Sequence, residues 1–134
     1  MVDHNIEGHA ALLLSTLESQ GWVEMGLLRL VTFRELSLPV ETSDREVWRF
    51  AREHRLLLLT GNRNMIGEDS LEQAIRDENP LDSIPVVTIA NLGRISENVY
   101  REVCAIELAS ICDEVERYLG NGRLYIPKQA VMLK

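Results

Sequence analysis

The sequence predicts an α/β domain of three layers, with a mostly parallel sheet between two layers of helices. Two short apolar runs, residues 56–60 and 85–90, have the length and composition of strands that are buried on both faces. Segments with apolar residues at helical spacing alternate with these runs. Polar and acidic motifs stand where strands should end, and an open parallel sheet gathers such groups in one crevice.

The composition is that of a soluble globular protein with one core. The chain has 134 residues, of which 46% are hydrophobic and 26% are charged. No apolar stretch approaches the roughly 20 residues that span a bilayer, and the first residues do not form a signal peptide. We therefore expect a single unit over residues 1–134, a cytoplasmic location and no contact with a membrane.

The first half of the chain predicts two helices and two strands. Apolar residues at helical spacing, namely Ile6, Ala10, Leu13, Leu14 and Leu17, predict a helix that ends near Gly21. Residues 27–33 are rich in β-forming side chains and predict a strand. Thr42 or Ser43 caps the second helix, and Glu46 completes a capping box. The inner face of that helix is expected to include His54, and the apolar run 56–60 follows as a buried strand.

The second half predicts two more helices, one of them long. The third helix starts at Asp69 or Ser70 and stops before Pro80. After the strand at 85–90, Ser96 is expected to cap a helix that reaches about Leu119. Two apolar stripes run along it, so it should pack on two sides or meet a second copy of the chain, and we expect a homodimer. Residues 122–127 predict a short edge strand.

The charged and sulfur-containing residues narrow the function. A formal net charge of −7 argues against a broad nucleic-acid-binding surface. Five arginines lie close together in the sequence and could meet a phosphate backbone, although local ion pairs are the preferred interpretation; they are Arg45, Arg49, Arg52, Arg55 and Arg63. Cys104 and Cys112 lie about 12 Å apart along the long helix, which is too far for a disulfide, so we expect buried reduced thiols. The three histidines have no zinc-site spacing.

Four motif residues are candidates for a site at the ends of the strands. They are Asp3, Asp44, Asn62 and Asn64. Carboxylates gathered in one crevice are explained most simply by a divalent metal ion. Each residue also has an ordinary interpretation: Asp3 as a solvated residue near the terminus, Asp44 as a helix cap, and the two asparagines as turn residues. Thr60 could donate a hydrogen bond within the site or simply suit a strand.

The order and spacing of these motifs resemble the compact toxin-like branch of the PIN nuclease superfamily. Family members begin with a strand that ends in Asp, which corresponds to Asp3. A Ser-Asp-x-Glu helix start follows, matched here by Ser-Asp-Arg-Glu at 43–46. A hydrophobic strand then ends in Thr-x-Asp-x-Asp-Phe, where this chain has Thr-Gly-Asn-Arg-Asn-Met at 60–65. The resemblance is strongest over residues 1–92, and the long helix and tail over 94–134 extend beyond it.

The resemblance implies a Mg²⁺ or Mn²⁺ ion that activates a water to cut RNA. It makes Asp3 and Asp44 the retained metal ligands, with Asn62 and Asn64 at positions where the family usually has Asp. An amide oxygen can coordinate a hard cation but adds no negative charge, so these asparagines weaken the site. Glu68, Asp69 and, from the first helix, Glu7 could restore the charge. The first strand is nearly absent, which should leave Asp3 poorly anchored.

Three functional interpretations follow. The first is a metal-dependent endoribonuclease, related to toxins, with a weakened acidic site. The second is an inactive PIN-like domain that binds RNA or a protein partner such as an antitoxin in the same crevice. The third is a receiver domain, which we disfavour because only Asp3 is available at the first strand end and Lys128 lies in the tail.

Overall fold

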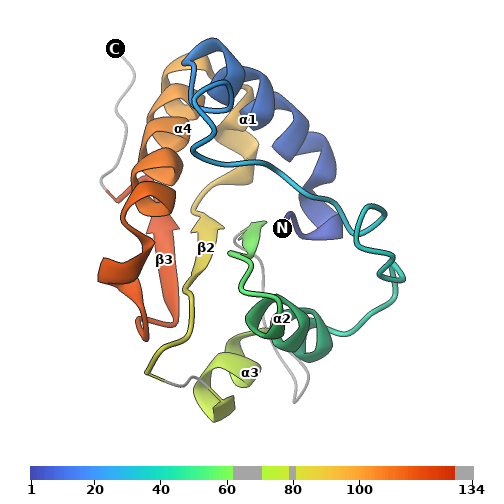
Figure 1. The fold of residues 1–134 in the computed structure, drawn as a ribbon. Coiled ribbons are helices and arrows are strands. Elements are labelled where there is room, and N and C mark those ends of the chain that lie inside the picture. The colour runs from blue at the N-terminus through green and yellow to red at the C-terminus, as the bar shows by residue number, and fades with distance from the viewer. Residues whose placement is uncertain (62–70, 79–80, 129–134) are drawn as a thin grey trace.

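A computed structural model describes residues 1–61, 71–78 and 81–128 (Figure 1). Within these ranges three strands form one sheet in the order β1-β2-β3: β1 (Leu59–Gly61), β2 (Val86–Ile89) and β3 (Arg123–Ile126). Both pairs of neighbouring strands are parallel. The predictions of a parallel sheet and of strands within 85–90 and 122–127 are therefore confirmed, with β3 at the edge of this sheet. The strand predicted at 56–60 also forms, but it begins only at Leu59 and ends at Gly61.

Residues 1–3 lie beside β1 and extend the sheet by a single residue pair. Val2 and Leu59 form an isolated parallel bridge. The backbone N–H of Leu59 donates to the carbonyl of Met1 (2.8 Å), and the N–H of Asp3 donates to the carbonyl of Leu59 (2.9 Å). The first strand is thus very short, as predicted. The expectation that Asp3 is poorly anchored is nevertheless wrong. These two hydrogen bonds hold the backbone on either side of it, and Asp3 is only 6% exposed.

The first three α-helices lie where the sequence predicts them. They are α1 (Glu7–Ser19), α2 (Asp44–Glu53) and α3 (Leu71–Glu78), and a short 3-10 turn, η1 (His4–Ile6), precedes α1. Ser43 is the N-cap of α2, and its hydroxyl oxygen accepts a hydrogen bond from the backbone N–H of Glu46 (3.3 Å). Gly21, just after α1, has φ +86°, a left-handed conformation that glycine adopts without strain and that commonly ends a helix.

The last long helix is shorter than predicted and differently capped. A 3-10 turn, η2 (Leu92–Ser96), comes before α4 (Asn98–Asp113), and another, η3 (Val115–Tyr118), follows it. Glu97 is the N-cap of α4 and makes no side-chain capping bond. Ser96 instead ends η2, where its hydroxyl donates to the carbonyl of Gly93 (3.5 Å). The apolar spacing of the sequence continues past Asp113, but there the chain forms the tighter 3-10 turn η3 instead of further α-helix.

The strand predicted at 27–33 does not form, although all of these residues are described. A single backbone hydrogen bond joins this segment to the described part of the sheet, from the N–H of Val2 to the carbonyl of Val31 (2.8 Å). Val31 and Phe33 are 8% and 3% exposed. The β-forming composition of the segment therefore reflects burial against the core, since strand propensity largely measures how side chains pack.

In the described part of the chain, the core consists of two clusters on opposite faces of the sheet. Leu59 and Val87 join the cluster that includes residues of α1 and α4. Leu58 and Val86, each one residue earlier, join the cluster that includes residues of α2 and α3. Neighbouring residues of a strand point to opposite faces, so each pair of helices covers its own face, as Figure 1 also shows. None of the helices in the described ranges is long and apolar enough to cross a bilayer.

One apolar stripe of α4 is buried and the other is not. Tyr100, Cys104 and Leu108 are at most 3% exposed and lie in the cluster shared with α1, whereas Val99 and Ile106 are 49% and 50% exposed. Of the two expected outcomes, packing of the second stripe within the chain is therefore not observed at Val99 and Ile106. The homodimer stays a prediction, with this second stripe on the surface.

The two cysteines are free thiols whose reactivity should be low in the folded protein. Cys104 is fully buried and Cys112 is partly buried. Burial raises the pKa of Cys104 to about 12 and also raises that of Cys112. Because the thiolate is the reactive form, we expect both thiols to react slowly with dithionitrobenzoate at pH 8, and both to react at once in guanidinium. Rapid labelling of Cys104 in the native protein would contradict the packing of α4.

Candidate functional site

Asp3 presents a carboxylate whose two oxygens are both held in place. The hydroxyl of Thr60 on β1 donates to Oδ2 (2.8 Å), and the backbone N–H of Asn5 donates to Oδ1 (3.2 Å). Thr60 is fully buried. The interpretation of Asp3 as a solvated terminal residue is therefore wrong, and of the two roles open to Thr60, the hydrogen bond within the site is the one observed. Asp3 is a fixed, oriented anion at the end of its short strand.

A row of polar side chains continues from Asp3 across the sheet. Thr60 and Thr88 are paired across β1 and β2, and both are fully buried. Arg123 on β3 donates from Nη1 to the hydroxyl of Thr88 (2.7 Å), and its Nη2 lies 3.3 Å from Oε2 of Glu72, in the first turn of α3. This polar row faces α2 and α3, because Thr60 and Thr88 lie two residues beyond Leu58 and Val86, which pack on that side.

Sequence reasoning missed Thr88, Arg123 and Glu72 as members of this row. Thr60 and Thr88 interrupt otherwise apolar strands, and that interruption was the available signal. Arg123 and Glu72 carry no comparable signal, because they lie far apart in the chain and come together only through the order of the strands.

Asp44 is the first residue of α2 and is half buried. Ser43 is the capping residue, so Asp44 is not the N-cap that its ordinary interpretation requires. Its negative charge still lies at the N-terminus of a helix, where the helix dipole favours an anion.

Glu7, another candidate for the site, pairs with His4: Oε2 of Glu7 and Nδ1 of His4 are 2.9 Å apart.

The other predicted ligands, Asn62, Asn64, Glu68 and Asp69, lie outside the described residues. Within residues 1–61, 71–78 and 81–128, no three His, Cys, Asp or Glu residues are grouped so that they could hold a metal ion. The described part of the chain therefore provides an oriented carboxylate at Asp3 and a second carboxylate at Asp44, but not a complete ligand set.

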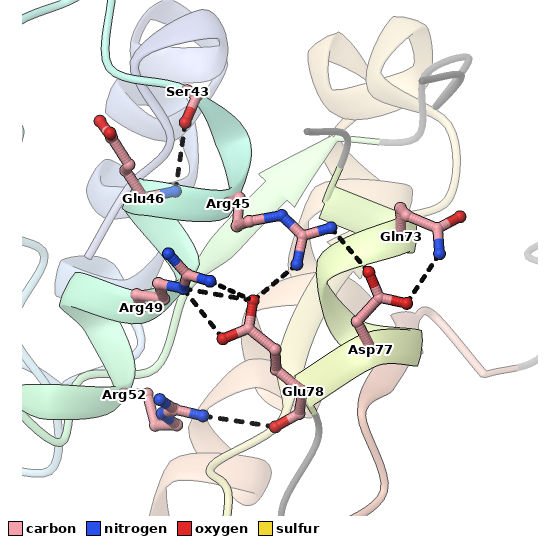
Figure 2. A network of polar contacts seen from close by, with 8 residues as sticks. All are labelled: Ser43, Arg45, Glu46, Arg49, Arg52, Gln73, Asp77 and Glu78. Carbon is pink, nitrogen blue, oxygen red and sulfur yellow. Dashed lines mark hydrogen bonds and ion pairs between the residues drawn. The ribbon is translucent and has the colours of Figure 1, made fainter. Parts of the chain in front are cut away.

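The arginines of α2 form an ion-pair network with the end of α3 (Figure 2). Arg45 donates to Glu78 (2.6 Å) and Asp77 (2.8 Å), and Arg49 donates from Nε to Glu78 (2.9 Å). Arg52 donates to the backbone carbonyl of Glu78 (3.3 Å). Hydrogen bonds from Arg49 lower the pKa of Glu78, and those from Arg45 lower the pKa of Asp77. The network joins α2 to α3, the helix that carries Glu72.

This network distinguishes the two interpretations of the arginine cluster, phosphate binding and local ion pairs. Local ion pairs, the preferred interpretation, are confirmed for Arg45 and Arg49, and Arg55 donates to the backbone carbonyl of Asp82 (3.1 Å). Arg63 lies outside the described residues. A phosphate backbone would have to compete with Asp77 and Glu78 for these guanidinium groups.

No family model, curated protein or solved structure matches this chain. The basis for a function is therefore the oriented carboxylate, the polar row and the resemblance of three sequence motifs.

Proposed function

We propose that this chain is a PIN-like protein of three α/β/α layers, acting as a metal-dependent endoribonuclease with a weakened acidic site. The observation that carries the proposal is Asp3, a buried carboxylate oriented by Thr60 and Asn5 at the carboxyl end of a parallel strand. Open parallel sheets bind their ligands at this edge. The parallel strand order and the separate helix pairs on the two faces support the same assignment.

The donor chemistry of the site suits Mg²⁺ or Mn²⁺. Asp3 and Asp44 offer hard oxygen ligands, the kind that these cations prefer. A bound ion would polarise a phosphodiester and lower the pKa of a bound water. Thr60 keeps the Asp3 carboxylate from rotating, and Asn62 and Asn64 would add neutral oxygens. Because these amides lack charge, we expect weaker metal binding than four carboxylates would give.

A second candidate function is a PIN-like domain that has lost catalysis and binds RNA or a protein partner in the same crevice. The asparagines at 62 and 64 favour it, since each replaces a charge that the family uses. The two functions share the fold and differ in whether a metal ion binds.

Calorimetric titration of Mn²⁺ into the wild type and Asp44→Ala tests the choice. We expect saturable binding in the wild type, loss of most of the heat in Asp44→Ala, and cleavage of a labelled RNA that stops when EDTA is added. Asp113→Asn, which removes an exposed carboxylate at the end of α4, is the matched control and should bind as the wild type does. Absence of both heat and cleavage in the wild type would overturn the nuclease and favour the binding domain.

A further inference from the structure

A small open hollow lies between α1 and residues 30–35, a segment that ends in a turn. Its volume is about 180 Å³. One wall is a stripe of α1 formed by Glu7, Ala10, Ala11 and Leu14, which lie on the same side of the helix because they are spaced three or four residues apart. The hollow exists because the two central positions of this stripe carry only methyl groups.

The remaining lining comes from the chain start and the facing segment. Val2, which is 1% exposed, and Leu30 add apolar surface, and Thr32 and Glu35 complete the opposite wall. The hollow is thus apolar over most of its lining, with one acidic residue in each wall.

Each of the two acidic side chains also has a polar partner within the chain. Oε2 of Glu7 lies 2.9 Å from Nδ1 of His4. Oε1 of Glu35 accepts a hydrogen bond from the backbone N–H of Thr32 (3.3 Å), which also lines the hollow. Nη1 of Arg29 lies 3.9 Å from Oε2 of Glu35. The Arg29 side chain is 77% exposed, and an ion pair this exposed to solvent is weak.

The size of the hollow limits what it can hold. Pockets for nucleotides or other drug-sized ligands have volumes of about 300–1,000 Å³. A cavity of about 150 Å³ holds a single benzene. A volume of about 180 Å³ therefore suits one side chain. Apolar walls favour a methylene stem and the two carboxylates favour a cationic head, and only lysine and arginine combine these properties.

We propose that this hollow receives one lysine or arginine side chain of a partner protein. The methylenes of that side chain lie against Ala10, Ala11 and Leu14, and its charged head meets Glu7 and Glu35. The hollow then distinguishes a basic side chain from a purely apolar one. This proposal does not depend on the proposed nuclease function, for which Glu7 was one of three candidates to restore charge.

Methyl NMR of the full chain, titrated with n-butylguanidinium and its neutral isostere n-butylurea, tests the proposal. We expect saturable shifts at Ala10, Ala11 and Leu14 with the cation, and at least about tenfold weaker binding of the urea. The double variant with Glu7→Gln and Glu35→Gln should reduce cation binding to the level of the urea. Glu18→Gln removes an exposed carboxylate of the same helix outside the hollow and should change nothing.

Two further measurements test the position of the site and the nature of its ligand. Ala11→Leu fills the hollow at an exposed position, so the fold should remain and binding of the cation should disappear. A capped leucine–arginine–leucine peptide should bind at least as tightly as n-butylguanidinium. Equal binding of n-butylurea, or shifts that survive Ala11→Leu, would overturn the site, and failure of the peptide would overturn its assignment to a partner protein.

Discussion

Replacing Leu108 with alanine is expected to lower the free energy of unfolding by about 2–5 kcal/mol. Leu108 is 1% exposed on α4 and belongs to the core cluster that this helix shares with α1 and the sheet. Removing its buried methyl groups loses their transfer free energy and leaves a cavity that the packed surroundings fill only in part. Urea unfolding followed by circular dichroism measures the loss.

Ile106→Ala is the matched control for this substitution. It removes a similar aliphatic side chain from the same helix, but at a position that is 50% exposed. We expect a change within about 0.5 kcal/mol, as for most surface substitutions. Equal losses for the two variants would show that the buried and exposed sides of α4 are wrongly assigned.

Substituting Asp3 should separate the charge of this residue from its structural role. Asp3→Asn keeps an oxygen that can accept the bond from Thr60 but removes the negative charge. We therefore expect it to retain most of the stability and to lose the heat of Mn²⁺ binding. Asp3→Ala removes the acceptor of the fully buried Thr60 hydroxyl, and an unsatisfied buried hydroxyl costs about 1–3 kcal/mol.

The cost of Asp3→Ala should be recovered in part by a second substitution. Thr60→Val removes the hydroxyl that has lost its acceptor, so the double variant should be more stable than Asp3→Ala alone. A double-mutant cycle of urea unfolding measures this coupling. Additive losses would contradict the Thr60–Asp3 hydrogen bond, whereas undiminished Mn²⁺ heat in Asp3→Asn would contradict Asp3 as a metal ligand.

Local patterns in the sequence were sufficient to predict most of the elements. The helices α1, α2 and α3 follow from apolar spacing, and the Ser43 cap follows from the residues around it. The three strands follow from short apolar runs bounded by turn residues. These signals are reliable because helix and strand periodicity, and capping, involve only residues that are close together in the chain.

Predictions that depended on the surroundings of a residue were less secure. Residues 27–33 have the composition of a strand but pack as an extended segment with a turn. His54, expected on the inner face of α2, is exposed and stacks on Phe50 with ring centroids 4.0 Å apart. In both cases the side-chain pattern is compatible with burial or exposure, and the neighbouring elements decide between them.

The sequence by itself determined the types of most elements, the parallel α/β character, and Asp3 and Asp44 as candidate site residues. Only the tertiary structure decided that Thr60 orients Asp3, that Thr88, Arg123 and Glu72 extend the polar row, and that the arginines of α2 pair with Asp77 and Glu78. The physical reason is sequence separation. Periodicity records local contacts, whereas these partners lie about 30 to 60 residues apart in the chain and meet only once the helices and strands have packed together.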